Sequence, residues 1–368
     1  MNRVTARAPG RINLIGEHTD YNNGYALPIA LTQQTTVHFD PDGSNTVTLS
    51  SEQEGAGTSF DIGAQPGDVG GWSAYPAGSL WALASAGYPV LGGTMTVNSQ
   101  VPIGAGLASS AALECAVLLA MNAATGTRLN RLDLARIAQS GENDFVGAST
   151  GLMDQIASLY GEVDRALLID CESLEVTSVG FDLEASGLSL VVINSHATHS
   201  HSTGEYASRR ETCSRAAHAL GIDSLRRLQD ANIEQTLTRV EDGTDRRRVR
   251  HVLTENRRVL DCAAALSAGE FRSVGEFMNR SHASMRDDFE ITTPLIDLIA
   301  ESAVRYGALG ARMTGGGFGG CVIALVGSDD AYRVADGVCA DVVRAGHRAP
   351  TWFVAHPGPG ATTSPVSG

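Results

Sequence analysis

The residues best suited to chemistry stand in a short run near the N-terminus, A-P-G-R-I-N-L-I-G-E-H-T-D-Y-N-N-G (Ala8–Gly24). This run places Arg11, Glu17, His18 and Asp20 within ten residues, among residue types that favour turns. Carboxylates and an imidazole held on a turn can hydrogen-bond hydroxyl groups, such as those of a sugar, in a fixed geometry. The alternative is a solvated loop with a local Arg–Glu pair. Four chemically different polar groups so close together favour a binding site.

A second segment combines glycines with hydroxyl side chains, V-P-I-G-A-G-L-A-S-S-A-A (Val101–Ala112). Gly104 and Gly106 follow a strand-like run and precede a long apolar run that is typical of a buried helix. Glycines at such a junction let backbone amides approach an anion, and the helix N-terminus adds partial positive charge. Ser109 and Ser110 could bind phosphate or a metal ion. A glycine-rich turn with serine as an ordinary helix cap explains the glycine spacing equally well.

Two acidic residues mark a third candidate. Asp154 lies in G-L-M-D-Q (Gly151–Gln155) among apolar residues, and Glu142 precedes it by twelve positions. A carboxylate that enters an apolar neighbourhood needs a partner, and a nearby cation would keep it ionised. The commoner alternative is an aspartate in the first turn of a helix, where it stabilises the helix dipole.

The fourth candidate is a glycine cluster, M-T-G-G-G-F-G-G-C (Met313–Cys321), with five glycines in six positions between two apolar runs. A hairpin turn does not require so many glycines. Either a bulky ligand approaches the backbone there or the loop has to move. A simple flexible loop is the alternative.

Two other clusters are weaker candidates. His196, His199 and His201 could bind zinc, but no further ligand pattern accompanies them. The run Arg246–Arg250 has the composition of a nucleic-acid-binding patch, yet on a helix it fits better as a solvated face with acidic neighbours. We therefore expect neither cluster to carry the function.

The composition excludes several classes of protein. All 27 basic residues are arginine, so the chain lacks the lysine of Walker A loops, protein kinases, pyridoxal enzymes and Schiff-base aldolases. If the protein handles nucleotides, backbone amides, hydroxyls, a metal ion and arginine must hold the phosphates. The formal net charge of −14 repels nucleic acid and anionic membranes, so we expect neither as a partner.

Cysteine usage and the first residues of the chain favour the cytoplasm. Six cysteines lie scattered without a C-x-x-C pair, which is typical of reduced and mostly buried thiols. The first ten residues lack the apolar core of a signal peptide. The longest apolar stretch, Leu113–Ala124, is shorter than the roughly 20 residues that span a bilayer. We expect a soluble cytoplasmic protein; a monomer is one option for its oligomeric state, which the sequence leaves open.

Strands and helices must bring these segments together, and the hydrophobic pattern predicts both. Strands are predicted at Thr35–Phe39, Thr46–Ser50, Gly93–Val97, Arg165–Asp170, Leu188–Ile193, Gly310–Thr314, Cys321–Val326 and Thr351–Ala355. Helices are predicted at Ser109–Ala124, Arg131–Phe145, Glu205–Leu220, Arg246–Ser267, Glu270–Arg286, Pro294–Tyr306 and Ala331–Ala345.

The length and this mixture of elements indicate the domain organisation. At roughly 150 residues per domain, 368 residues suggest two domains or one large one. We expect an α/β fold with an N-terminal domain at residues 1–180 and a C-terminal domain at residues 181–356. The composition of residues 357–368 predicts a disordered, dispensable tail.

In this order, the four segments resemble the motifs of the GHMP small-molecule kinase superfamily. G-R-I-N-L-I-G-E-H-T-D-Y-N (Gly10–Asn22) resembles the signature of its galactokinase family almost residue for residue. The second segment resembles the superfamily's phosphate loop, and the third and fourth resemble its catalytic-aspartate motif and third motif. The resemblance extends from residue 8 to residue 320. It implies two α/β domains with the active site in the cleft between them.

The resemblance also implies a reaction, in which the γ-phosphoryl group of ATP passes to the anomeric hydroxyl of α-D-galactose and gives galactose 1-phosphate and ADP. Asp154 would be the base that accepts the hydroxyl proton, and Arg11 would neutralise charge beside it. Ser110 and Glu142 would hold Mg²⁺. The sugar would be bound by Glu17, His18, Thr19, Asp20, Gly151 and Tyr206, and the phosphates by Gly104, Ala105, Gly106, Leu107, Ala108, Ser109 and Ser110.

Two departures from the family pattern leave this expectation intact. Ala108 stands where the family often has serine, and A-S-T-G precedes the catalytic motif where many relatives have P-C-G. Neither change removes a charged or metal-binding group. A related kinase for N-acetylgalactosamine, arabinose or galacturonate is an alternative, and a non-catalytic sugar and ATP sensor is another. Because Arg11, Ser110, Glu142 and Asp154 are all present, an enzyme is favoured.

Overall fold

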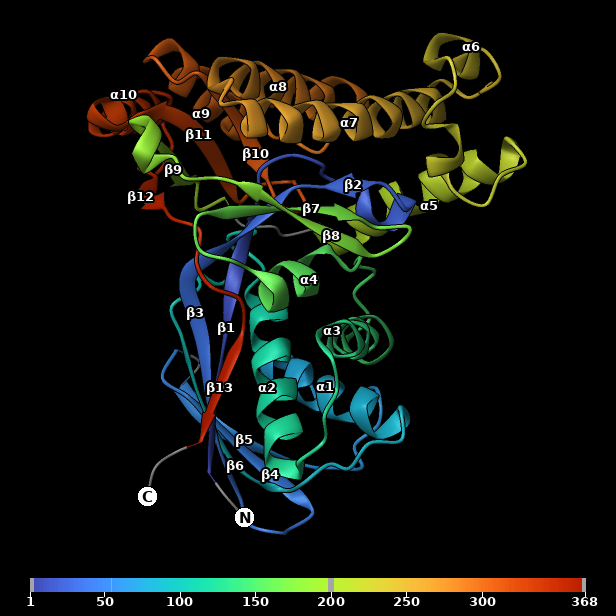
Figure 1. The fold of residues 1–368 in the computed structure, drawn as a ribbon, viewed down its shortest axis with the longest axis vertical. Helices are drawn as coiled ribbons and strands as arrows, with labels where there is room; N and C mark the ends of the chain where they lie inside the picture. Colours follow the sequence, from blue (N-terminus) through green and yellow to red (C-terminus); the bar gives the residue numbers. More distant parts are fainter. Residues whose placement is uncertain (1–2, 54, 198–201, 366–368) are drawn as a thin grey trace.

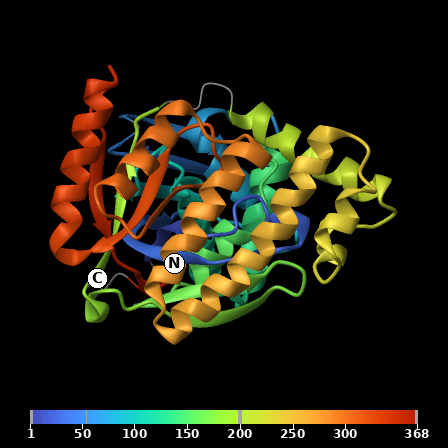
Figure 2. The ribbon, with the colours of Figure 1, turned by 90° about the horizontal axis from the view of Figure 1, so that it is seen from above.

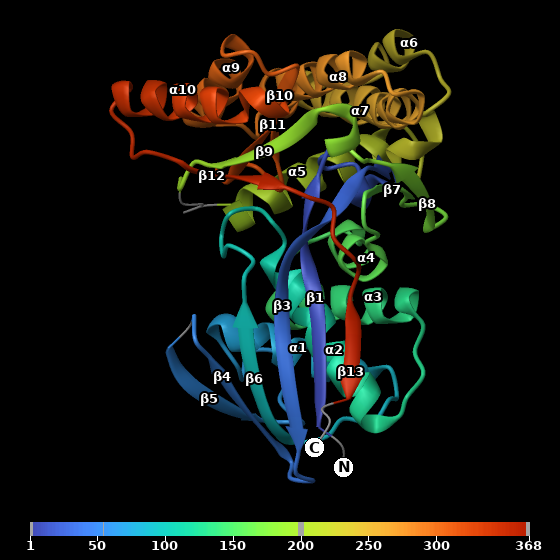
Figure 3. The same ribbon diagram turned by 60° about the vertical axis from the view of Figure 1, so that its left-hand side comes forward.

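A six-stranded sheet brings the first and the last strand of the chain side by side (Figures 1 and 3). The computed structural model describes residues 3–53, 55–197 and 202–365. The strands of this sheet are β1 (Val4–Asn13), β3 (Pro28–Pro41), β4 (Thr46–Ser51), β5 (Gly55–Asp61), β6 (Gly93–Ser99) and β13 (Thr362–Pro365). Their order is β13-β1-β3-β6-β4-β5, and all neighbours are antiparallel except β4 and β6.

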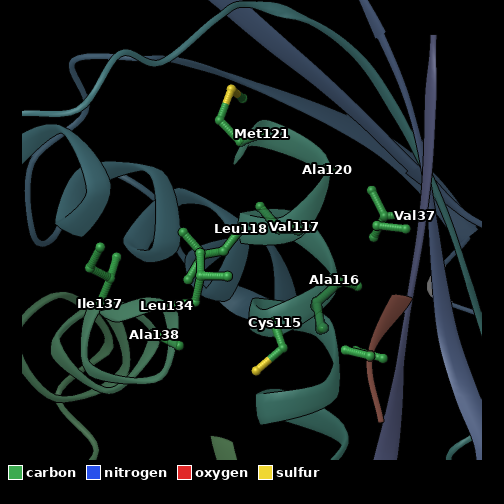
Figure 4. Packing of buried hydrophobic residues seen from close by; sticks show 14 of the residues in the cluster. Val37, Cys115, Ala116, Val117, Leu118, Ala120, Met121, Leu134, Ile137 and Ala138 are labelled. Carbon is green, nitrogen blue, oxygen red and sulfur yellow. The ribbon is translucent and has the colours of Figure 1, made fainter. Parts of the chain in front are cut away.

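Helices lie on one face of this sheet (Figures 1 and 3). The helices α2 (Ser109–Thr125) and α4 (Met153–Tyr160) contact β1 and β3, while α1 (Ala74–Ser85) and α3 (Arg131–Ser140) pack on α2. As predicted, α2 is buried on nearly all sides, because its residues are almost entirely apolar. Figure 4 shows Val37 of β3 on one side of α2 and Leu134 and Ile137 of α3 on the other. This helix is the centre of the first hydrophobic core.

A second, four-stranded sheet lies at the opposite end of the molecule, beneath a layer of helices (Figures 1 and 2). Its strands are β9 (Leu188–Asn194), β10 (Gly310–Thr314), β11 (Cys321–Gly327) and β12 (Thr351–Ala355), in the antiparallel order β10-β11-β9-β12. The helices of this part are α5 (Ser202–Ala219), α6 (Ile233–Leu237), α7 (Gly243–Ala268), α8 (Phe271–Ser284), α9 (Pro294–Arg305) and α10 (Ala331–Arg344). The second core lies between this sheet and these helices.

Short helical turns complete the described elements. The 3₁₀ turns are η1 (Asp20–Asn22), η2 (Gly71–Ser73), η4 (Glu184–Ser186), η5 (Leu225–Leu228) and η7 (Ser328–Asp330). Two segments are π-helical, η3 (Gly141–Val146) and η6 (Met285–Phe289). None of the helices within the described residues is both long and apolar enough to cross a membrane.

A three-stranded sheet and a third core connect the two ends of the molecule. The sheet is β2 (Tyr25–Ala26), β7 (Arg165–Asp170) and β8 (Glu175–Gly180), in the order β2-β7-β8. The third core mixes residues from both halves of the chain, for example Ile12 with Val259. Apolar contact is therefore continuous across residue 180, and the boundary placed there stays a prediction.

The mixed α/β architecture is as predicted. Two elements near the site differ from the prediction. The pattern of residues 131–145 predicted one helix, but α3 ends at Ser140 and the chain continues as the π-helix η3. Such widened turns are frequent at functional sites, and this one carries Glu142. The residue types of Ala8–Gly24 predicted turns, yet Arg11 lies on the strand β1, which ends at Asn13. The loop begins only after it.

The prediction of a disordered tail at residues 357–368 is wrong for its described part. Gly358 donates from its backbone amide to the Ala30 carbonyl, and Ala361 donates to the Ser158 carbonyl at 2.9 Å. β13 then pairs with β1, from Val4 opposite Pro365 to Arg7 opposite Thr362. Composition predicted disorder because proline and glycine dominate the segment. These residues instead let it pass closely over the α4–β7 turn, where Gly360 approaches the Leu159 carbonyl.

Ending the chain after His356 is expected to reduce the free energy of unfolding. The truncation removes β13 and the amide hydrogen bonds from Gly358, Gly360 and Ala361. At about 1 kcal/mol for each of these bonds, the loss is about 3 kcal/mol or more. Urea denaturation measures it, with a chain ended after Pro365 as the control. Equal stability of the two truncated chains would contradict the structural role of this segment.

Candidate active site

All four segments singled out in the sequence meet in one cleft. Its walls come from the loop after β1, the loop 101–108 between β6 and α2, the turn before α4 and the glycine loop 315–320. The predicted residues that line it are Arg11, Glu17, His18, Asp20, Gly104, Gly106, Leu107, Ala108, Ser109, Ser110, Glu142, Gly151, Asp154 and Tyr206. Gly315, Gly316 and Gly317 line it as well.

A bidentate ion pair between Arg11 on β1 and Asp154 on α4 lines the cleft. Arg11 Nε donates to Asp154 Oδ1 at 2.8 Å, and Arg11 Nη2 donates to Asp154 Oδ2 at 2.7 Å. Burial lowers the pKa of Arg11, but the charge of Asp154 and its hydrogen bonds outweigh this effect, so the net pKa is raised. Planar two-point pairs of this kind hold a carboxylate in one orientation. The pair therefore fixes Asp154 although the two residues are 143 positions apart.

The same arginine ties the loop 101–108 to β1. Its third contact runs from Nη1 to the Gly106 carbonyl at 2.6 Å, and its backbone amide donates to the Leu107 carbonyl at 3.0 Å. Gly106 has a left-handed φ of +76°, and its carbonyl lies where a side chain at Gly315 would collide, 2.7 Å from the ideal Cβ position. Two glycine-rich loops from opposite halves of the chain thus touch, which explains why glycine is needed in both.

The loop 101–108 leads directly into the N-terminus of α2. Ala108 is left-handed, with φ +57° and ψ +47°, and precedes the first turn of the helix. Ser109 and Ser110 in that turn line the cleft. Free amides at a helix N-terminus and the helix dipole both attract anions. This end of the cleft is therefore suited to phosphate groups.

Ser110 and Glu142 form an oxygen-only pair beside that anion-binding end. Ser110 Oγ donates to Glu142 Oε1 at 3.0 Å, while Thr150 and Gln155 each donate to Glu142 Oε2 at 2.9 Å. Burial raises the pKa of Glu142, and the negative charge of Asp154 raises it further. A divalent cation would relieve both effects. Hydroxyl and carboxylate oxygens are the donors that Mg²⁺ prefers, so this pair fits such an ion.

Asp20 and Gly151 form the opposite end of the cleft. A Cβ atom at Gly151 would lie 1.9 Å from Asp20 Oδ2, so only glycine lets the carboxylate occupy this position. Burial raises the pKa of Asp20 to about 6, and the negative charge of Asp154 contributes. Asp20 can accept hydrogen bonds from a ligand, because the contacts of the described residues leave its side chain largely unengaged.

Glu17 and His18 line the cleft but already hold the glycine loop 315–320. Glu17 Oε1 accepts from the Gly315 amide at 2.7 Å, and His18 Nε2 contacts the Gly316 carbonyl at 3.0 Å. The other carboxylate oxygen of Glu17 accepts from Asn13 and pairs with the fully buried Arg312 at 3.3 Å. Burial lowers the pKa of His18 to about 3, so its ring is neutral near pH 7.

The remaining predicted residues differ in how they relate to the cleft. Tyr206 on α5 lines it, with its ring centroid 4.7 Å from that of His18. Thr19 and Ala105 do not line it; they are 0% and 2% exposed. The Thr19 hydroxyl contacts the Gly16 carbonyl at 2.8 Å, so this side chain shapes the loop.

The described residues of the two weaker clusters do not line the cleft. His199 and His201 lie outside the described residues, and His196 Nε2 contacts Thr351 Oγ1 at 3.0 Å. No group of three or more His, Cys, Asp or Glu residues that could bind a metal occurs within the part of the chain that the structure describes. The run Arg246–Arg250 has the expected acidic neighbours, but Arg248 is buried beside Glu290 rather than solvated.

Three residues that hold the carboxylates of Glu142 and Glu17 in place were not predicted from the sequence. Thr150 and Gln155 fix Glu142, and Arg312 fixes Glu17. Gln155 is the last residue of the G-L-M-D-Q segment, so its position beside Asp154 was a signal that could have been used. Arg312 precedes the glycine loop by only three positions, but nothing in its spacing indicates a partner near residue 17.

Models of known protein families match most of the chain. A model described as the galactokinase galactose-binding signature matches residues 2–41. Models of the N-terminal and C-terminal domains of GHMP kinases match residues 74–162 and 262–344. Together these ranges contain the loop after β1, the loop 101–108, Asp154 and the glycine loop.

Individual relatives match at nearly full length. A galactokinase of Mycobacterium tuberculosis (strain H37Rv) is 54% identical over 358 residues, covering 97% of this chain and 98% of the relative. A galactokinase of Streptomyces coelicolor is 43% identical over 365 residues, covering 96% and 92%. The crystal structure of Lactococcus lactis galactokinase complexed with galactose superposes with a TM-score of 0.93 at 34% identity, covering 98% of this chain and 95% of that one.

A double-mutant cycle on Arg11 and Asp154 tests the ion pair without any ligand. Each alanine variant leaves the other charge without its partner inside the cleft, so the effects on unfolding should not add. We expect a coupling free energy of about 1–3 kcal/mol, measured by urea denaturation. The exposed pair Arg3–Asp40 serves as the matched control and should give about 0.5 kcal/mol or less. Additive effects at Arg11 and Asp154 would refute the pairing of these two residues.

Proposed function

The chain belongs to the galactokinase family of GHMP kinases, and we propose that Asp154 is its base for phosphorylation at the anomeric hydroxyl of α-D-galactose by ATP. The products are galactose 1-phosphate and ADP. The observation that carries the assignment of the base is the bidentate Arg11–Asp154 pair, which aims one carboxylate into the cleft between its anion-binding end and its hydroxyl-binding end.

The chemistry begins at the sugar hydroxyl. A neutral hydroxyl is a poor nucleophile near pH 7, and a positioned general base contributes about 10²–10⁴-fold to the rate. Asp154 takes the proton as the anomeric oxygen bonds to the γ-phosphorus. The bond from that phosphorus to the oxygen bridging to the β-phosphate breaks, and its electrons leave with ADP. The two N–H donors of Arg11 hold this carboxylate in one orientation for the step.

Arg11 also supplies fixed positive charge to the transferring group. Its contacts to Asp154 and Gly106 use three N–H donors, and a guanidinium has five. The two that remain can donate to a phosphoryl oxygen. Arg11 is the only arginine among the described residues that line the cleft, and the chain has no lysine. Loss of Arg11 therefore removes the one arginine charge among the described lining residues.

Magnesium fits this account as the ion that accompanies ATP. Ser110 and Glu142 would hold it, through the hydroxyl and the carboxylate described above. When bound, Mg²⁺ neutralises negative charge on the phosphates during transfer. The amides of the loop 101–108 and the N-terminus of α2 would bind the phosphates themselves. Galactose and MgATP are thus the proposed partners, and the cytoplasm is the proposed location.

The sugar would bind at the Asp20 end of the cleft. Asp20 accepts hydroxyl hydrogen bonds most readily, because Glu17 and His18 already contact the glycine loop. Glu17 and His18 can add a contact each while keeping that loop in place. Gly151 and Tyr206 complete this end, and Thr19 supports it through the loop backbone.

An ADP-release assay with MgATP and a panel of sugars tests the proposed function. Galactose should give the highest kcat/KM, with N-acetylgalactosamine, arabinose and galacturonate as competing substrates. Phosphorus NMR should identify the product as the anomeric phosphate. A higher kcat/KM for another sugar would assign a different substrate, and no ADP with any sugar would assign a sensor.

An Asp154→Asn variant is the control for the base in this assay. Asparagine keeps the size of the side chain but cannot accept the proton as a carboxylate does. Galactose binding, measured by calorimetry, should stay near the wild-type value, while kcat falls by about 10²–10⁴-fold. A variant with the wild-type kcat would rule out Asp154 as the base.

Galactose binding is expected to weaken as the pH falls through about 6, because the pKa of Asp20 is raised to about 6. If only the ionised carboxylate binds well, the dissociation constant should rise about tenfold between pH 7 and pH 5. Calorimetry without ATP measures this and avoids titration of the nucleotide. An unfolded aspartate titrates at about pH 4. Proton uptake by Asp20 therefore stabilises the fold over this range, and unfolding through this group cannot explain weaker binding.

The matched variant for this measurement is Asp20→Asn. It should bind galactose more weakly than wild type at pH 7, with little change between pH 7 and pH 5. A wild-type dissociation constant that is constant over this range would contradict the role of Asp20. The same pH dependence in Asp20→Asn would assign the titration to another group.

A further inference from the structure

A buried glutamate without a charge partner lies behind the anion-binding end of the cleft. Glu114 stands on α2 one turn after Ser110, and it is 0% exposed. No arginine or histidine among the described residues pairs with it. Its Oε2 contacts Gln155 Nε2 at 3.5 Å, and its Oε1 has no hydrogen-bond partner there.

Gln155 connects this glutamate to the candidate metal ligand. Its side chain, on α4, is also 0% exposed. Gln155 Nε2 donates to Glu142 Oε2 at 2.9 Å and lies 3.5 Å from Glu114 Oε2. An amide nitrogen carries two hydrogens, so one can serve each carboxyl group. Elements from three parts of the chain are thereby joined through a single amide.

The contacts of Glu142 show what this amide does. Glu142 Oε2 receives hydrogen bonds from Gln155 and Thr150, whereas Oε1 receives one from Ser110. The two hydrogen bonds to Oε2 fix the orientation of the Glu142 carboxylate. Oε1 is thereby kept beside the Ser110 hydroxyl, where the two oxygens can act on the same ion. Hydrogen bonds to a ligand from behind commonly set both its orientation and the affinity for metal.

The character of Glu114 supports a role beyond packing. Burial raises the pKa of Glu114 well above its usual range, and the charge of Glu142 adds to this effect. Both effects favour the neutral, protonated form of this side chain. An apolar residue of similar size would fill the same space without the cost of burying a carboxyl group. Glu114 instead provides an acceptor for the second hydrogen of the Gln155 amide.

We propose that Glu114 and Gln155 are positioning residues for the divalent cation. Glu114 orients the amide of Gln155, and Gln155 orients Glu142 toward Ser110. Neither residue lines the cleft or touches substrate. This inference rests on the proposed function, since it assigns the supporting contacts of the ion that accompanies ATP.

Binding of Mn²⁺, in place of Mg²⁺, to the enzyme–ADP complex tests the proposal directly. Electron paramagnetic resonance of free Mn²⁺ gives its dissociation constant without any turnover. Glu114→Met and Gln155→Met keep side-chain length but remove the polar atoms, and each should weaken Mn²⁺ binding by about 10–100-fold. ADP binding without metal should stay near the wild-type value, because the amides that bind phosphate are unchanged.

Two further variants separate positioning from loss of stability. Glu114→Gln retains a neutral acceptor for the Gln155 amide and should restore Mn²⁺ binding close to the wild-type value. Val117→Ala removes buried volume from the same helix and leaves every polar group of the cluster in place, so it should lower the melting temperature while Mn²⁺ binding stays unchanged. If one methionine variant does not fold, the other still provides the test.

The outcomes of this experiment are distinct. Mn²⁺ binding as tight as wild type in Glu114→Met or Gln155→Met would overturn the proposal. So would an equal loss in Val117→Ala, or a Glu114→Gln variant as weak as Glu114→Met. Failure of the proposed function would appear already in the wild type, as absence of Mn²⁺ binding with ADP and of galactose-dependent ADP release.

Discussion

The site depends on one interaction, the bidentate pair between Arg11 and Asp154. It joins the strand β1 to the helix α4, and the same guanidinium holds the loop 101–108 through the Gly106 carbonyl. Three segments that are far apart in the chain thus share one side chain. The glycine loop 315–320 then packs on Gly106, and Glu17 and His18 hold its backbone. If the arginine were absent, a carboxylate and a loop would both lose the contact that orients them.

The balance of charge in the cleft follows from this arrangement. Asp20, Glu142 and Asp154 face it, while Arg11 is the only arginine among its described lining residues. The protein therefore cannot neutralise several phosphate charges with its own side chains. Backbone amides, a helix N-terminus and a metal ion are the groups left to do so. A chain without lysine shows this constraint in a simple form, because every fixed positive charge is a guanidinium.

Much of the site was predictable because its polar residues stand in short, contiguous segments of the sequence. Arg11, Asp20, Ser110, Glu142 and Asp154 meet in one cleft, as their motifs indicated. The contact between Gln155 and Glu114 was not predictable from the sequence, because it depends on how α2 and α4 pack against each other. The composition of residues 357–365, rich in proline and glycine, predicted disorder. The structure instead pairs the end of this segment, β13, with β1. Local patterns describe a segment alone, whereas such pairings belong to the whole fold.

We propose that the cleft holds the anomeric hydroxyl against Asp154 and the phosphates against the N-terminus of α2. A crystal structure with galactose, Mg²⁺ and a non-hydrolysable ATP analogue tests this arrangement. We expect the anomeric oxygen within about 2.6–3.2 Å of an Asp154 carboxylate oxygen, in line with the γ-phosphorus. We also expect the metal on Ser110 and Glu142. A complex in which the anomeric oxygen faces away from Asp154, with another residue at that distance, would contradict it.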